Sequence, residues 1–234
     1  MPPDRRDGRP ARRPQRDPPA RRRRARGGRL RPRSGAAAVR ALRRRALPCG
    51  RPLAGPREAH SATLLRDGRV LVCGGTGADG RALATAELYD PASDRWSPAG
   101  RLGEGRTKHA AVRLPDGRVL LVGGARDRES RGRLASTELY DPAAGRFTPG
   151  PRLRAGRYKL PDAVVALPDG RVLVAGDAPE VEIVDPARGR VTLARGDLGA
   201  ARAFATATRV GADVLVLGGY DERIAIQAGA YLVG

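Results

Sequence analysis

The sequence of 234 residues predicts an all-β fold built from about four repeated sheets of four strands. Three observations lead to this prediction. One phrase recurs every 42 to 51 residues, each copy contains short apolar runs joined by turn signals, and residues 57–234 lack any convincing helical periodicity. A repeat of about 40–50 residues made of several short strands is typical of the blades of a β-propeller, which pack side by side around an axis.

The first repeat shows how each unit divides into strands. Residues 61–65 and 69–73 are apolar runs separated by Asp67-Gly68, and Asp-Gly in this position is a strong hairpin signal. The 69–73 run is almost entirely Val and Leu, which indicates a strand covered on both faces. Residues 86–89 and 95–97 are the third and fourth predicted strands, and the Asp-Pro pair after the third ends its pairing.

Glycines after the second strand and aromatic residues near the third and fourth recur from copy to copy. The first two copies are complete, the third has Asp177 in place of a glycine and has lost its aromatic residues, and the fourth ends near Tyr231 without a fourth strand. The residues assigned to the structural repeat are Gly74, Gly75, Tyr89, Trp96, Gly123, Gly124, Tyr140, Phe147, Gly176, Gly218 and Gly219.

This pattern resembles the kelch repeat, in which a double glycine follows an apolar strand and is followed by a tyrosine and a tryptophan. The phrases Arg-x-x-His-Ser-Ala and Asp-Gly-Arg-Val-Leu-Val are similar to those of bacterial tandem kelch proteins. The resemblance covers residues 57–234. It implies a kelch-type β-propeller with blades at about 57–104, 105–155, 156–198 and 199–234.

The segment before the first repeat bears on how such a ring closes. Residues 45–53 are similar to the fourth-strand segments 95–102 and 146–153. We therefore expect a propeller domain at 45–234, in which residues 45–49 supply the missing strand of the last blade. The alternative is an incomplete ring, which is either left open or completed by a second chain, because an unpaired strand edge favours association.

Residues 1–44 are expected to form a disordered, basic arm rich in Arg and Pro. Residues 1–45 hold 18 Arg and three Asp, so they carry +15 of the net charge of +20. Such a segment buries too little apolar surface to fold. It would attract nucleic acid or anionic lipid through charge, without aromatic residues for base stacking. The alternatives are an inert tail, a targeting remnant, or a true start further along the chain.

Localisation stays open at this stage. The basic segment is not followed by the uninterrupted apolar run of about 7–15 residues that a secretory signal needs. The protein is therefore expected to be cytoplasmic by default, or exported if the true start differs. No stretch approaches about 18 apolar residues, so no membrane span is expected. Cys49 and Cys73 are interpreted as buried thiols, with a disulfide as the alternative.

The residue types needed for catalysis are scarce, so we expect no enzyme, no cofactor and no metal. His60 and His109 occupy one slot of successive repeats, which later copies fill with Leu160 and Ala205. The resemblance to kelch repeats also implies a distant similarity to galactose oxidase. The central domain of that enzyme is a kelch-like propeller that holds copper through Tyr and His ligands. Nothing here matches that ligand set residue by residue. A degenerate remnant of such an oxidoreductase is kept as an alternative.

Repetition places one arginine at the start of the first strand in every copy. If that strand is innermost, these arginines gather at the mouth of the central channel and favour a carboxylate or phosphate ligand. The alternative is that each arginine binds backbone carbonyls or an acid of its own blade, such as Glu87 or Glu138. The candidate ligand-binding residues are Arg57, Arg106, Arg157, Arg202, His60, His109, Lys108 and Lys159.

The function predicted from these observations is noncatalytic binding through one face of the propeller. The ligand is expected to be a protein or a glycan, contacted by the rim residues and by the long loops at 76–85 and 125–137, since surface loops commonly carry recognition. Nucleic acid is a candidate partner only for the basic arm, and an oligomer is expected if the ring is open.

Overall fold

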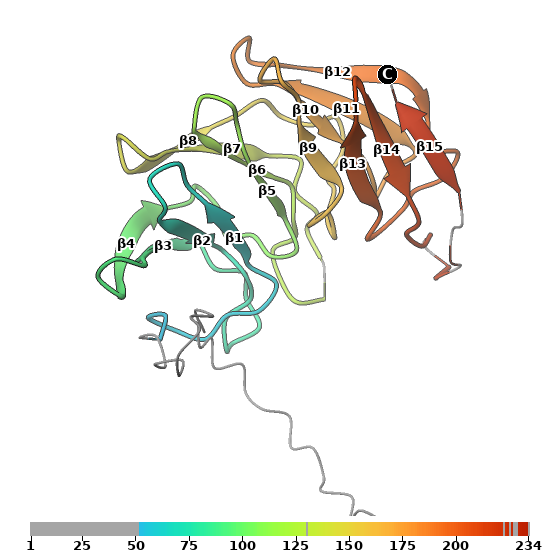
Figure 1. The fold of residues 1–234 in the computed structure, drawn as a ribbon. Helices are drawn as coiled ribbons and strands as arrows, with labels where there is room; N and C mark the ends of the chain where they lie inside the picture. Colours follow the sequence, from blue (N-terminus) through green and yellow to red (C-terminus); the bar gives the residue numbers. More distant parts are fainter. Residues whose placement is uncertain (1–51, 130, 222, 225, 227–228, 234) are drawn as a thin grey trace, which may run out of the picture. The chain divides into compact units, whose positions relative to one another are not determined.

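The computed structural model describes residues 52–129, 131–221, 223–224, 226 and 229–233. These residues form four antiparallel sheets and no helix, which confirms the all-β prediction (Figure 1). The predicted arm at 1–44 and the predicted closing strand at 45–49 lie outside the described residues. Their structure and the predicted domain boundary therefore stay predictions.

The sheets follow the chain in order, and we call them blades 1 to 4. Blade 1 has β1 (Ser61–Leu64), β2 (Val70–Cys73), β3 (Thr85–Asp90) and β4 (Arg95–Arg101). Blade 2 has β5 (Ala110–Arg113), β6 (Val119–Val122), β7 (Thr137–Asp141) and β8 (Arg146–Pro149). Blade 3 has β9 (Val164–Ala166), β10 (Val172–Val174), β11 (Glu180–Asp185) and β12 (Arg190–Asp197), and blade 4 has β13 (Thr206–Val210), β14 (Asp213–Leu217) and β15 (Ala230–Val233).

The Asp-Gly turns form the hairpins that the sequence predicts. In blade 1 the amide of Leu65 donates to the carbonyl of Arg69, and Gly68 has a φ of 86°. The Asp67 carboxylate accepts from both the amide and the side chain of Arg69. The same arrangement joins β5 to β6 and β9 to β10, so one local turn design fixes the register of three hairpins.

The fourth strand of blade 1 is longer than predicted. It was expected at 95–97 but runs from Arg95 to Arg101. Pro98 did not end it because β4 is an edge strand, where the missing proline donor leaves no ladder hydrogen bond unmade. The pairing of β3 with β4 brings Tyr89 opposite Trp96, with ring centroids 5.1 Å apart.

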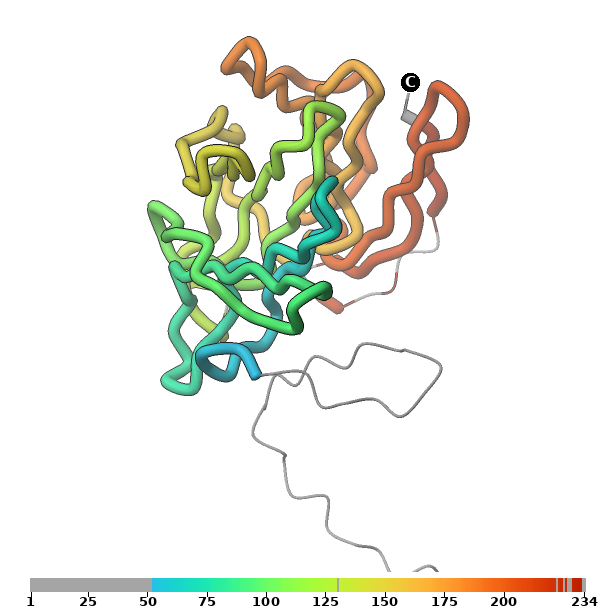
Figure 2. Tube along the Cα trace, turned by 60° about the vertical axis from the view of Figure 1, so that its left-hand side comes forward, coloured from blue at the N-terminus to red at the C-terminus, as the bar shows by residue number. Residues whose placement is uncertain are grey.

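The first strand of each blade is the innermost, and the blades follow one another along an arc. β1 contacts β5, β5 contacts β9, and β9 contacts β13. Figure 1 shows blade 1 and blade 4 at the two ends of this series, and Figure 2 shows the same series with blade 1 turned towards the viewer. Among the described strands, β13 and β1 do not form a contact comparable to those three. Blade 4 has three described strands and the other blades have four.

An apolar layer lies at each of the three boundaries between blades. Leu71 and Leu88 of blade 1 pack with Leu121 and Tyr140 of blade 2. Blades 2 and 3 meet through a larger cluster that includes Leu120, and the layer between blades 3 and 4 completes the set. The second strands of blades 2 and 3, β6 and β10, are thus buried on both faces, which explains their unbroken runs of Val and Leu.

Candidate functional site

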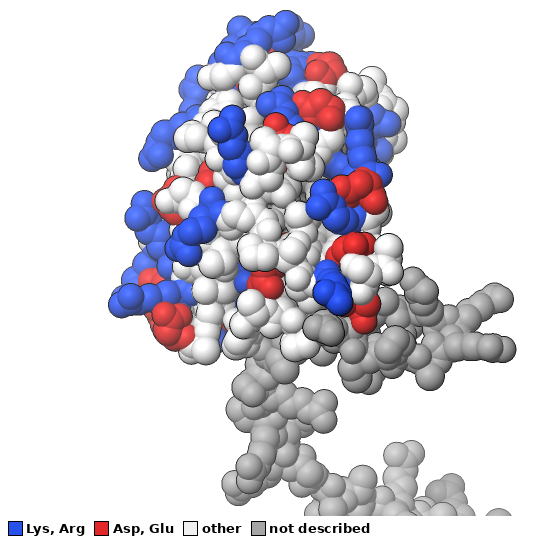
Figure 3. Space-filling view, turned by 90° about the vertical axis from the view of Figure 1, so that its left-hand side faces the viewer, with Lys and Arg blue, Asp and Glu red and all other residues white. Residues whose placement is uncertain are grey.

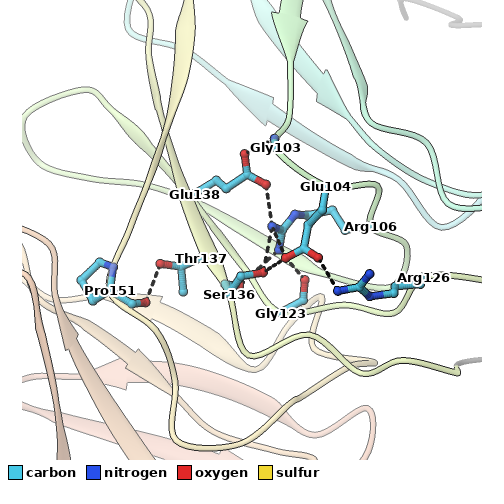
Figure 4. Close-up of polar contacts among 9 residues, drawn as sticks. All are labelled: Gly103, Glu104, Arg106, Gly123, Arg126, Ser136, Thr137, Glu138 and Pro151. Carbon is cyan, nitrogen blue, oxygen red and sulfur yellow. Dashed lines mark hydrogen bonds and ion pairs between the residues drawn. The ribbon is translucent and has the colours of Figure 1, made fainter.

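The repeated arginine of blade 2 is buried, and both of its terminal nitrogens donate hydrogen bonds, whereas its Nε has no partner among the described residues (Figure 4). The Arg106 guanidinium lies 2.6 Å from the Glu138 carboxylate and donates to the Gly123 carbonyl at 2.7 Å. It also donates to the Ser136 carbonyl and hydroxyl, each at 3.2 Å, and the Ser136 hydroxyl donates to Glu104. A charge taken out of water needs such compensation, so this pairing holds the end of β6 against β7.

Blades 1 and 3 repeat this arrangement. Arg57 pairs with Glu87 at 2.6 Å, and Arg157 pairs with Glu182 at 2.8 Å. In each blade the same glutamate also accepts a backbone amide of the segment that leads into the blade, namely Ala54, Gly103 and Arg154 for blades 1, 2 and 3.

Blade 4 keeps the arginine but changes its partner. Arg202 donates to the hydroxyl of Tyr231 at 2.7 Å and to the carbonyls of Leu198 and Gly218. Tyr231 pairs with Val216, whereas in blade 1 the residue opposite the equivalent Val72 is Glu87. The tyrosine that ends the fourth repeat therefore occupies the position of the glutamate and not that of Tyr89.

These contacts agree with the alternative stated above, in which each arginine binds backbone carbonyls or an acid of its own blade. All four guanidinium groups are turned into their own blade and carry hydrogen bonds there. This engagement disfavours a role as a rim of free cations for an anionic ligand, and ligand binding by the arginines stays an untested prediction.

The glycine pairs lie where the chain passes closest to the next blade. A Cβ on Gly74 would lie 2.4 Å from the Arg106 carbonyl, and one on Gly123 would lie 2.4 Å from the Arg157 carbonyl. In blade 3 the second glycine is replaced by Asp177, which keeps a φ of 55°. Asp and Asn tolerate this left-handed conformation better than most residues, which accounts for the substitution.

The two histidines share a slot but differ in environment. His109 is buried, and its Nε2 lies 2.8 Å from the Ser61 hydroxyl across the boundary between blades 1 and 2. Desolvation, together with the positive charge of Arg106, lowers the pKa of His109 to about 3. His60 is exposed. Leu160 and Ala205 fill the same slot in the later blades and are buried.

A series of left-handed residues runs across the blades, two positions after the arginine that recurs in each repeat. Ala59, Lys108, Lys159 and Phe204 have φ values of 52°, 54°, 56° and 55°. The amide of Lys108 donates to the carbonyl of Ala59, that of Lys159 to Lys108, and that of Phe204 to Lys159. We call this set the axial series, because it precedes the innermost strands. The repeated left-handed backbone and its hydrogen bonds link the segments that lead into the four innermost strands.

Aromatic side chains surround Lys159 in this series. The Lys159 ammonium donates to the Tyr220 hydroxyl at 2.8 Å and lies 5.0 to 5.6 Å from the ring centroids of Tyr158, Phe204 and Tyr220. These distances are typical of cation–π contacts. Desolvation lowers the pKa of Lys159, but the hydrogen bond with Tyr220 raises it above its ordinary value. We call these four residues the axial cluster.

Lys108 and Lys159 were predicted from the repeat, whereas the aromatic residues around Lys159 were not. Tyr158 comes from blade 3, whereas Phe204 and Tyr220 come from blade 4, so only the packing of the blades brings them together. A signal was present in the repeat, because the slot of Ala59 in the first copy is Phe204 in the fourth. The Lys108 ammonium, in contrast, donates to the carbonyl of Arg128.

The described residues hold few other features of a chemical centre. None of their His, Cys, Asp and Glu side chains form a group of three or more that is placed to hold a metal ion. Cys73 is a buried thiol. Within the same part of the chain, no helix has the length and apolar character needed to cross a membrane. Figure 3, which faces the side of β4, shows charges of both signs around an uncharged centre.

Comparison with known proteins agrees with this architecture. The Kelch motif family model matches residues 59–103, which contain all four strands of blade 1. No curated protein matches the chain. The fold and its repeated sites define a repeat protein with the sheets of a β-propeller. This match, which falls on blade 1, supports the kelch repeat that the sequence predicts.

Proposed function

We propose that this chain is a noncatalytic binding module that recognises a protein ligand through the axial cluster, Tyr158, Lys159, Phe204 and Tyr220. The observation that carries the proposal is the placement of three aromatic rings around one lysine, with Phe204 48% exposed. Exposed aromatic residues are enriched at protein interfaces, since they offer large apolar area at a low cost in conformational entropy.

The backbone supports the same proposal. Lys159 and Phe204 are held at positive φ and are linked by a hydrogen bond of 3.0 Å between blades 3 and 4. A site built on such fixed positions loses little freedom on binding. The lysine ammonium favours a peptide that presents a carboxylate beside an apolar side chain. A glycan remains the second candidate, because sugar rings also pack on exposed aromatic side chains.

The proposal that the module is not a catalyst is supported by the surroundings of His109 and Asp177, two residues whose pKa values are strongly shifted. His109 is buried against Ser61, and the Asp177 carboxylate accepts from the amide of Tyr158. Each group thus makes a hydrogen bond within the fold. Copper analysis and an assay for peroxide production test the alternative of an oxidoreductase remnant, which predicts stoichiometric copper in the purified protein.

A random peptide library and a glycan array, each applied to the immobilised full chain, test the binding proposal. The expected result is a set of acidic peptides whose affinity falls at least ~10-fold in a Lys159→Ala, Phe204→Ala double variant. Arg195→Ala is the control, because Arg195 is exposed on β12, away from the cluster. Equal binding by the double variant would show that recognition lies elsewhere, and selection of glycans alone would favour the second candidate.

Binding of polyanions by the arginine-rich segment is a separate proposal. Its support is compositional, since residues 1–45 carry 15 of the 20 net positive charges. Retention of the chain on heparin or DNA, with and without residues 1–44, is the direct test. The proposal requires that the deletion abolish the salt-sensitive retention.

A further inference from the structure

One face of every blade covers the next blade along the chain, and we call it the forward face. A cross-strand row on this face is buried or half-buried in the first three blades, formed by Thr63, Leu71 and Leu88 in blade 1 and by Val112, Leu120 and Leu139 in blade 2. The same row in blade 4 is Thr208, Leu215 and Leu232, and Leu232 is 64% exposed. Blade 4 therefore presents an interface face that no described residue covers as fully as in the other blades.

A second position on the forward face shows the same contrast. Cys73 and Val122, which end β2 and β6, and Ala175, which follows β10, are fully buried. The registers of β1 with β2 and of β13 with β14 place Leu217 at this position in blade 4, and Leu217 is exposed.

The opposite face of each blade, which packs against the preceding blade, is called the backward face. In blade 1 some residues of this face are less buried than their equivalents in the other blades. Val119, Val172 and Val214 are buried on the backward faces of the other blades, whereas the equivalent Val70 is only half-buried. The histidine slot agrees, because it is buried in blades 2, 3 and 4 but His60 is exposed. Val72 and Tyr89 of the same face are already buried, so the incomplete cover of blade 1 lies at Val70 and His60.

The polar residues at these ends are matched as well. At the boundary of blades 1 and 2, the Ser61 hydroxyl on a forward face meets the His109 ring on a backward face at 2.8 Å. The next two boundaries have alanine in the serine position, with Leu160 and Ala205 opposite. The two end blades again carry a hydroxyl and a histidine at these positions. Thr206 of blade 4 is equivalent to Ser61, and His60 of blade 1 is equivalent to His109.

The axial series also has two ends that fit each other. Each of its hydrogen bonds runs from the amide of one blade to the carbonyl of the preceding blade. The series begins at Ala59 of blade 1 and ends at Phe204 of blade 4. The amide of Ala59 and the carbonyl of Phe204 are the donor and the acceptor that one more junction of the same kind would join.

We propose that a second copy of this chain completes the ring, with the forward face of blade 4 in each copy packed against the backward face of blade 1 in the other. Two such junctions related by a twofold axis leave neither end open. Two copies of four blades give eight, within the range of about four to eight found in propellers. In each junction Thr206 of one copy would meet His60 of the other, as Ser61 meets His109.

The mass of the full chain in solution is the first test. Sedimentation equilibrium in salt high enough to screen the arginine-rich segment should give about 50 kDa, twice the 24.8 kDa of one chain. A monomer at micromolar concentration would overturn the proposal, because the ends would then be covered within one chain or left uncovered. A series of larger species would also overturn it, because it would show open-ended growth.

A charged substitution on the forward face of blade 4 tests the site of contact. Leu232→Asp should weaken the dimer at least ~10-fold, as loss of a central apolar contact does. Leu193→Asp is the matched control, since Leu193 is a leucine 43% exposed on β12, outside both end faces, and this variant should stay dimeric. An unchanged dimer of Leu232→Asp with a native circular dichroism spectrum would contradict the proposal.

Cross-linking settles which faces meet. A benzophenone amino acid at position 232 should react with residues 70–101 in a product of dimer mass, because Val70, Tyr89 and Trp96 form one row on the backward face of blade 1. Cross-links to blade 4 of another copy would overturn the proposed pairing of faces. Cross-links to blade 1 in a product of monomer mass would show that a single chain closes its own ring.

Discussion

The Asp177 carboxylate accepts a hydrogen bond from the backbone amide of Tyr158 at 2.9 Å. In blades 1, 2 and 4 the equivalent amides, those of Glu58, Thr107 and Ala203, donate instead to backbone carbonyls of the loop after the glycine pair. The loop in blade 3 is short, and the aspartate side chain stands in for the carbonyl. The residue that breaks the glycine pattern thus preserves its hydrogen bond.

This arrangement predicts an unusual dependence of stability on pH. Desolvation raises the pKa of Asp177 to about 6, against the opposing effects of the Tyr158 amide and of Arg133, Arg157 and Lys159. An acid with a raised pKa in the folded state binds its proton more tightly there than in the unfolded state. The stabilising contribution of the Asp177 carboxyl group to the free energy of unfolding is therefore greatest below about pH 4. This contribution is lost as the pH rises through about 6.

Asp177→Asn should remove this dependence, since asparagine keeps an acceptor oxygen and tolerates positive φ. Above pH 6 the variant should be the more stable protein, by up to about 3 kcal/mol, and the gain should vanish near pH 4. Urea unfolding of both proteins at pH 4 and pH 7 measures the difference. A difference that does not change with pH would rule out the raised pKa.

The buried ion pairs should dominate the response to charge removal. Glu138→Ala leaves the buried Arg106 guanidinium without its carboxylate, and we expect the free energy of unfolding to fall by about 3–5 kcal/mol. Arg118→Ala breaks an ion pair with Asp116 of similar length, 2.7 Å, but on the surface, and should cost less than about 1 kcal/mol. Similar losses in the two variants would refute the structural role of the buried pair.

A methyl group should be tolerated at one left-handed glycine and not at another. Gly124 has a φ of 105°, and a Cβ there would lie 2.8 Å from the Thr107 carbonyl and 2.9 Å from Cβ of His109. Gly145 has a φ of 62° with open space around it. Thermal unfolding should show a loss of about 1 kcal/mol for Gly145→Ala and at least about 3 kcal/mol for Gly124→Ala. Equal losses would show that the close approach adds nothing to the cost of positive φ.

His109 should stay neutral well into the acid range. Because burial lowers its pKa to about 3, the unfolded chain takes up a proton near pH 6.5 that the folded chain refuses. Its contribution to stability is thus complete above about pH 6.5 and is lost as the pH falls towards 3. His109→Leu, which copies Leu160 in the same slot, should make unfolding less sensitive to acid between these values. An NMR titration in which the His109 ring titrates near pH 6 would contradict this prediction.

Much of the fold follows from local sequence. The Asp-Gly turns, the Val and Leu runs and the glycine pairs predict the strands of blade 1 to within a few residues, and β4 runs beyond its predicted end because its edge position is not visible in the sequence. The candidate site was predicted only in part. The repeat singled out Lys159, but nothing near it in the chain indicates Tyr220, which lies 61 residues away.

The repeat, the strand pairing within each blade and the residues that recur from blade to blade could be predicted from the sequence alone. These features depend on neighbouring segments joined by short turns. The orientation of the repeated arginines depends on packing within each blade, where a buried guanidinium pairs with a nearby carboxylate, as Arg106 does with Glu138, or with a hydroxyl, as Arg202 does with Tyr231. The tertiary structure also brings aromatic residues from blades 3 and 4 around Lys159, and it leaves Leu232 and His60, on the end faces of the described blades, exposed. Those features arise only from contacts between blades, whose geometry no single repeat encodes.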